Sequence, residues 1–142
     1  MTPQQLKKAL QAAGFEVFRT AGEDIVLADR VRENLILDSG VRLRSGTPLQ
    51  VRVVLRAQKA DFPSEEEGAL FERVRKLAAP ALEAGFAEAA TAVSKVTDPA
   101  DKERTLDTFY EIVFAKDVDG GVENAVPSLK FAMSLEKTAA NR

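Results

Sequence analysis

The chain has 142 residues, of which 45% are hydrophobic and 30% charged, a composition typical of a globular protein rather than a disordered segment. It has no cysteine, which excludes disulfides and thiolate chemistry and fits a reducing compartment. It also has no histidine, the commonest general base and metal ligand near neutral pH. We therefore name no catalytic residue, no cofactor and no metal ligand, and we favour a function without catalysis.

Charge is unevenly distributed along the chain. Residues 1–60 hold ten Lys and Arg against six Asp and Glu, a balance of +4, and residues 61–142 hold ten against sixteen, a balance of -6. The halves can neutralise each other within one fold, or a basic face can serve an acidic partner. The first residues do not form a signal peptide, and no stretch is apolar for long enough to span a bilayer. We expect a cytoplasmic protein without a membrane partner.

The chain opens with the pattern of a capped helix. Thr2 can serve as the N-cap, Pro3 as the first helical residue and Gln5 as the residue that completes a capping box. Gly14 can adopt the left-handed conformation that ends a helix. We expect a helix over residues 3–13.

Two short strands and an ambiguous segment follow. Alternation of apolar and polar residues predicts strands at residues 15–19 and 24–28, joined by a turn at Gly22. Residues 29–33 fit either a short helix or the lead into the next strand. We favour a strand that begins near Asn34.

Residues 34–57 predict a central hairpin with two different faces. Its apolar residues occupy odd positions and should share one face. They are Leu35, Leu37, Val41, Leu43, Leu49, Val51, Val53 and Leu55. Four arginines occupy even positions and should share the opposite face, where Arg19 can join them. These candidate partner-binding residues are Arg42, Arg44, Arg52 and Arg56.

The arginine row is the strongest functional pattern in the sequence. Guanidinium groups bind carboxylates and phosphates in a bidentate geometry that lysine does not match. A surface for single-stranded nucleic acid would also carry exposed aromatic residues between the arginines, and this row has none. We expect an acidic protein partner or ion pairs within the chain, and no nucleic acid.

Residues 64–85 predict a second helix with an interruption. Residues 64–67 have the spacing of a capping box, and its three adjacent glutamates would point about 100° apart on a helix. We interpret them as a solvated helix start rather than a metal site. Pro80 lies within the helical pattern and should bend or split the helix near residues 76–79.

The segments 86–97 and 105–116 predict a second hairpin, joined by turn-forming residues between them. Asp107 and Glu111 fall on its outer face, about 13 Å apart at the rise of a strand, which is too far for a paired-carboxylate glycosidase site. We expect these two acidic residues beside the arginine row, where opposite charges on neighbouring strands attract.

The last predicted element is a helix that starts near Asn124, so that Pro127 falls within its first turn, and runs to about Ala139. Before it, Asp117 and Asp119 resemble a fragment of a calcium loop. The remaining acidic ligands of that motif are missing, so we interpret the segment as a strand-to-helix turn.

Together these elements predict a single α+β domain over residues 1–142. It should have an antiparallel sheet of five to six strands and three helices, in the order α-β-β-β(-β)-α-β-β-α. This order resembles the fold of type III secretion chaperones, with two departures, the additional strand before the second helix and Pro80. The resemblance implies a homodimer that masks a partner polypeptide along an exposed sheet or helix face, without catalysis.

We therefore expect a non-enzymatic cytoplasmic protein-interaction module, chaperone-like or adaptor-like and dimeric. The alternative is a small ligand-binding protein or enzyme that holds an acidic metabolite through the sheet arginines. A third reading is a structural subunit of a larger assembly.

Overall fold

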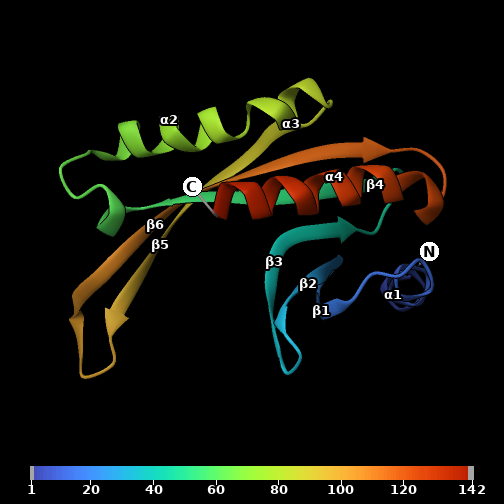
Figure 1. The fold of residues 1–142 in the computed structure, drawn as a ribbon, viewed down its shortest axis with the longest axis horizontal. Helices are drawn as coiled ribbons and strands as arrows, with labels where there is room; N and C mark the ends of the chain where they lie inside the picture. Colours follow the sequence, from blue (N-terminus) through green and yellow to red (C-terminus); the bar gives the residue numbers. More distant parts are fainter. Residues whose placement is uncertain (1, 141–142) are drawn as a thin grey trace. The chain divides into compact units, whose positions relative to one another are not determined.

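The computed structural model describes the backbone of residues 2–140 and the side chains of residues 2–137. Over these residues the chain forms four α-helices and one antiparallel sheet of six strands, in the order β1-β2-β3-β4-β6-β5, which confirms the predicted α+β class (Figure 1). The elements are α1 (Pro3–Ala12), β1 (Val17–Ala21), β2 (Asp24–Arg32), β3 (Leu35–Arg44), β4 (Leu49–Gln58), the 3-10 helix η1 (Lys59–Asp61), α2 (Glu67–Leu77), α3 (Ala79–Glu83), β5 (Ala87–Asp98), β6 (Asp101–Val118) and α4 (Val122–Ala140).

The chain divides into two compact units. The first comprises Met1–Val53 and Ala115–Arg142, and the second comprises Val54–Phe114. The first unit therefore contains α1, β1 to β3 and α4, whereas the second contains α2, α3 and β5. Strands β4 and β6 contribute residues to both units.

Helix α1 forms where the capping pattern predicts it. The Thr2 hydroxyl accepts a hydrogen bond from the Gln5 backbone N–H at 3.2 Å, and the Gln5 side chain accepts one from the Thr2 N–H at 2.9 Å. Gly14 has φ +95° just beyond the helix, a conformation that costs glycine little. Leu6 and Leu10 are fully buried, and the helix packs against β1 and β2.

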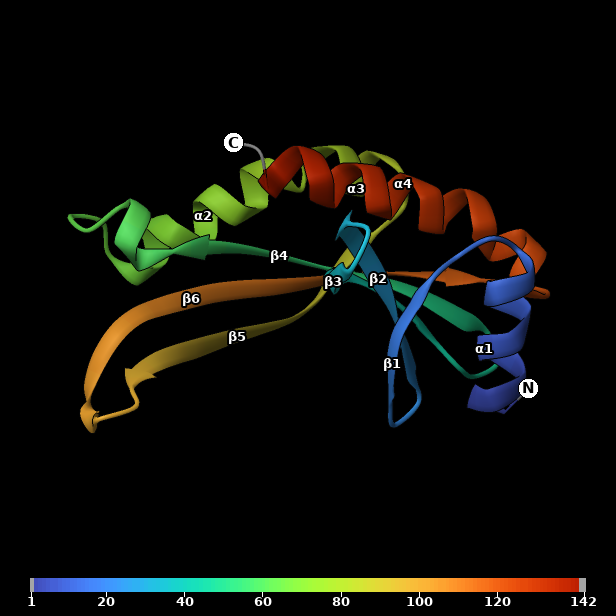
Figure 2. The same ribbon diagram turned by 60° about the horizontal axis from the view of Figure 1, so that its bottom comes forward.

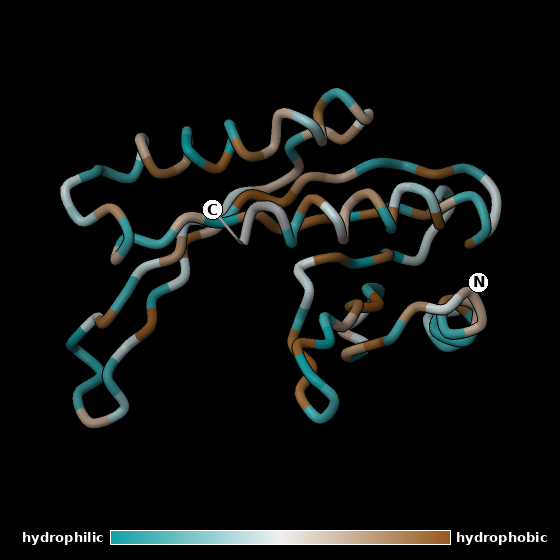
Figure 3. Tube along the Cα trace, in the orientation of Figure 1, coloured by the Kyte–Doolittle hydropathy of each residue, from teal (hydrophilic) through white to brown (hydrophobic). Residues whose placement is uncertain are grey.

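The alternating pattern of the central hairpin is confirmed where it lies over α4. The odd-numbered apolar residues from Val41 to Val53 are buried on the face that α4 covers (Figure 2). Figure 3 shows hydrophobic and hydrophilic residues alternating along β3. Leu37 departs from the prediction, because its side chain is 49% exposed. Leu37 pairs with Asp29 of β2, beyond an irregularity in the β2–β3 register between Val26 and Ala28.

The ambiguous segment at residues 29–33 is strand rather than helix. Strand β2 continues to Arg32, and a two-residue turn leads into β3 at Leu35, one residue from the predicted start. Asp29 pairs with Leu37 across the two strands. Pairing with β3 therefore decides the conformation of a segment whose local sequence fits two states.

Pro80 divides the predicted second helix in two, which gives four helices over residues 2–140 instead of three. Helix α2 ends at Leu77, and Pro80 lies in the first turn of α3. Backbone N–H groups in a first turn make no hydrogen bond within the helix, so proline costs little there. The predicted capping box is wrong, because Glu66 is the N-cap and makes no side-chain cap. Glu65 instead forms a two-point ion pair with Arg73.

Helix α4 begins at Val122, two residues before the predicted start, so Pro127 lies in its second turn. The Asn124 side chain donates a hydrogen bond to the Asp119 carbonyl at 3.0 Å, which stabilises the helix start at Val122. Over the described residues, none of the helices combines the length and apolar character that crossing a bilayer requires.

Candidate functional site: an arginine cluster and an exposed hairpin

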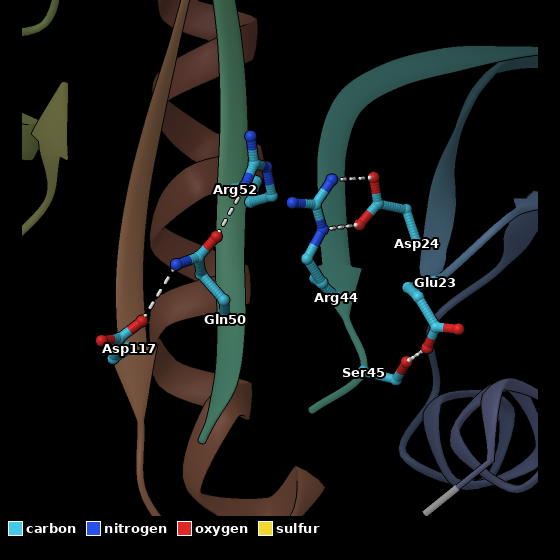
Figure 4. A network of polar contacts seen from close by, with 7 residues as sticks. All are labelled: Glu23, Asp24, Arg44, Ser45, Gln50, Arg52 and Asp117. Atoms are coloured by element: carbon cyan, nitrogen blue, oxygen red, sulfur yellow. Dashed lines mark hydrogen bonds and ion pairs between the residues drawn. The ribbon is translucent and has the colours of Figure 1, made fainter. Parts of the chain in front are cut away.

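Three of the four predicted arginines come together in the first unit. Arg42 on β3 lies directly opposite Arg52 on β4, and Arg44 lies opposite Gln50. All three arginine side chains are half-buried. Their even positions place them on the sheet face opposite α4, and Figure 4 shows Arg44 and Arg52 in front of the strands with α4 behind. We call Arg42, Arg44 and Arg52 the arginine cluster.

Arg44 is neutralised by a carboxylate from the neighbouring strand. Asp24 begins β2 and lies opposite Arg44 in the β2–β3 register. Its two carboxylate oxygens accept hydrogen bonds from Arg44 Nε at 2.8 Å and Nη2 at 3.1 Å (Figure 4). This side-chain hydrogen bonding raises the pKa of Arg44. The pair is the fork geometry in which arginine binds a carboxylate most strongly.

Arg42 is only partly satisfied. Its Nη2 donates to Asp38 Oδ2 at 2.9 Å. Its Nη1 is buried and has no hydrogen-bond acceptor among the described residues. A buried donor without an acceptor costs free energy, because it has given up its hydrogen bonds to water.

Arg52 has no carboxylate partner within the described part of the chain. Its Nη1 donates to the neutral amide oxygen of Gln50 at 2.6 Å, and the Gln50 amide in turn donates to Asp117 at 3.0 Å (Figure 4). The pKa of Arg52 is lowered, first by burial and then by the positive charges of Arg44 and Arg42, whereas the negative charge of Asp24 opposes this shift. Arg52 is thus the cluster member whose charge is least compensated.

The fourth predicted arginine, Arg56, and the added candidate Arg19 have other surroundings. Arg56 belongs to the second unit, is exposed, and stacks over the Phe109 ring at 4.8 Å from the ring centroid. Val26 on β2 pairs with Arg19 of β1 on one side and with Arg42 of β3 on the other, so it lies between the two arginines.

Asp107 and Glu111 form hydrogen bonds within the second unit. Asp107 Oδ1 accepts hydrogen bonds from the backbone N–H groups of Ala60 and Thr108, and Glu111 accepts one from the Ser94 hydroxyl. These hydrogen bonds hold together segments of the second unit. The expectation that the two carboxylates lie beside the arginine row stays a prediction.

A second feature is the exposure of the hairpin formed by β5 and β6. The side chains of Ala87–Thr97 on β5 and of Asp101–Leu106 on β6 are exposed, and we call these residues the hairpin arm. Figures 1 and 2 show the tip of this hairpin extending away from α2. Val93, Val96 and Leu106 are each between 42% and 51% exposed. Val93 and Val96 have opposite parity, so apolar side chains are exposed on both faces of β5.

The two edges of the sheet differ in how well they are protected. Edge strand β1 has 5 residues and an irregular register at Val17 and Arg19, whereas edge strand β5 has 12 residues. Short, irregular edges resist pairing with other chains, and long ones with few charges invite it. Between Ala89 and Ser94, β5 carries no charge and no proline.

Sequence reasoning found the arginines but missed the groups that surround them. Asp24 lies on β2, and only the pairing of β2 with β3 brings it to Arg44. Asp38 lies on β3 itself, four positions before Arg42. Gln50 and Asp117 are 67 positions apart in sequence, so no local signal connects them.

The chain matches no family model, no curated protein and no solved structure.

Proposed function

We propose that this chain is a non-enzymatic cytoplasmic protein-interaction module, chaperone-like or adaptor-like, that works as a homodimer. The observation that carries the proposal is the hairpin arm, whose side chains are exposed on both strands. The lack of cysteine supports a reducing compartment. The chaperone-like element order supports a dimer that binds a further polypeptide.

The hairpin arm needs a partner for physical reasons. A two-stranded hairpin without further cover is at best marginally stable in water. The arm exposes apolar side chains, of which Leu106 at 51% is the most exposed. Its outer strand β5 also presents unpaired backbone groups along the edge of the sheet. A partner strand would satisfy these groups and bury the apolar side chains together.

A second copy of the chain is the partner that β5 fits. A two-fold axis perpendicular to the sheet would set β5 antiparallel to its own copy, as in an isologous interface. If the axis passes at Ala92, Glu88 lies opposite Val96 and Lys95 lies opposite Ala89. No like charges then face each other, and the uncharged centre of the strand forms the core of the pairing.

Sedimentation velocity tests this proposal with two alanine-to-lysine variants. We expect the parent chain to sediment as a dimer and Ala92→Lys as a monomer, because each new ammonium would meet its own copy at the axis. Ala12→Lys introduces the same side chain at an exposed position of α1 and should remain dimeric. A monomeric parent chain, or an Ala92→Lys variant that dimerises as strongly as Ala12→Lys, would overturn the proposal.

A further inference from the structure

The arginine cluster has an excess of hydrogen-bond donors at its centre. Arg42 and Arg52 lie directly opposite each other on adjacent strands, an arrangement of like charges that destabilises a sheet. Asp38 occupies one side of Arg42, and Asp24 occupies the fork of Arg44. Arg52 has only the neutral Gln50 oxygen as an acceptor within the described residues. The fold therefore maintains an unfavourable arrangement of charges that an anion would relieve.

The geometry identifies where an anion would bind. Figure 4 shows the third nitrogen of the Arg44 guanidinium, the one that Asp24 does not use, pointing toward Arg52. Both residues are only half-buried, and the Arg44 side chain is 44% exposed. Arg42 lies beside Arg52 and adds a third positive charge, with its Nη1 unpaired among the described residues.

The surroundings of the cluster favour a singly charged anion. Asp24, Asp38 and Asp117 are all hydrogen-bonded within this network. A phosphate dianion would bring two negative charges near these three carboxylates, whereas a carboxylate brings one. A carboxylate also offers two oxygens in one plane, which is the shape that a guanidinium binds best.

We propose that Arg44 and Arg52, supported by Arg42, bind an aspartate or glutamate carboxylate from an acidic segment of a partner polypeptide. A sheet face suits a polypeptide segment, whereas a small metabolite usually binds in a concave pocket. The cluster belongs to the first unit and the hairpin arm to the second, so this proposal does not depend on the proposed homodimer.

Fluorescence anisotropy with a labelled hexaglutamate peptide tests the assignment. We expect the parent chain to bind this peptide and not a labelled hexaglutamine peptide. Arg52→Gln should weaken binding by about tenfold or more, because it removes a charged hydrogen-bond donor. The matched control is Arg30→Gln, which removes an exposed arginine of the same unit that is paired with Glu16. This control should bind as tightly as the parent chain.

Two further measurements keep the test decisive. Arg52→Lys keeps the charge but loses the planar fork, so we expect it to fold and to bind more weakly than the parent chain. Thermal unfolding should show that Arg52→Gln is no less stable than the parent chain, because the substitution removes repulsion from Arg44 and Arg42.

Several outcomes would overturn the proposal. Equal binding of hexaglutamate by Arg52→Gln and Arg30→Gln would show that the cluster is not the site, as would the absence of any binding. Tighter binding of succinate or inorganic phosphate than of hexaglutamate would assign the cluster to a free small anion. If Arg52→Gln abolished the dimer and Arg30→Gln did not, the cluster would be assigned to contacts between two copies of this chain.

Discussion

At the scale of single residues, the arginines of this chain divide into two groups. Arg44, Arg73 and Arg75 each contact a carboxylate through two nitrogens, and the pKa of each is raised by those hydrogen bonds. Arg52 is the opposite case, because burial and neighbouring arginines lower its pKa. Arginines of the first group hold segments together, whereas Arg52 has no paired carboxylate among the described residues and only the charge of nearby Asp24 opposes the lowering of its pKa.

The Arg75–Glu88 pair predicts a dependence of stability on pH. Hydrogen bonds from Arg75 lower the pKa of Glu88. A carboxyl group whose pKa is lower in the folded state contributes stability above its unfolded-state pKa, and this contribution is lost as the pH falls through the folded-state pKa. The pair should therefore help to hold the start of β5 at neutral pH and release it in acid.

The substitution Arg75→Gln tests this dependence. We expect the pKa of Glu88, followed by NMR titration of its side-chain carboxyl carbon, to rise toward its ordinary value in the variant. Glu65 is the internal control, because Arg73 rather than Arg75 lowers its pKa. A shift of Glu65 together with Glu88, or no shift of Glu88, would contradict the account.

At the scale of elements, sequence patterns predicted local structure well and pairing poorly. The capping box of Thr2 and the helix break at Pro80 depend on residues a few positions apart, and both are confirmed. The capping box predicted at residues 64–67 is wrong because Glu66 rather than Ser64 is the N-cap of α2, and it makes no side-chain cap. Residues 29–33 are strand because β3 lies beside them, which their own sequence does not specify.

The packing of α4 gives a prediction at this scale. Leu129 is fully buried, so Leu129→Ala should lower the free energy of unfolding by about 2 to 5 kcal/mol through lost burial and a residual cavity. Leu82 on α3 is 50% exposed, and Leu82→Ala should cost about 0.5 kcal/mol or less. Urea unfolding of both variants measures the difference. Similar losses of unfolding free energy in the two variants would show that the stability of α4 does not depend on the burial of Leu129.

At the scale of the whole molecule, the sequence predicted the fold class and most of the strands, but not how much of each strand is covered. Alternation in β3 and β4 coincides with burial because α4 lies on one face. The segment at residues 86–97 was predicted as a strand as well, yet Ala87–Thr97 are exposed. Exposure depends on which other elements pack against a strand, and no periodicity within the strand encodes it.

The arginine cluster shows the same limit. Even positions placed Arg42, Arg44 and Arg52 on one face, as the structure confirms. Arg44 binds Asp24 of β2, whereas Arg42 binds Asp38 of its own strand and Arg52 binds Gln50 of its own strand. The sequence pattern did not specify these contacts. Arg56 has the same parity and belongs to the second unit, where it stacks over the Phe109 ring.

The central claim is that a second copy of the chain pairs with the outer edge of β5. Amide hydrogen exchange of residues 89–94, measured at increasing protein concentration, tests it most directly. In an antiparallel strand alternate N–H groups face the outer edge, and these should become protected as the dimer forms and lose that protection in Ala92→Lys. Fast exchange of the same groups at every concentration, in the parent chain and the variant alike, would contradict the claim.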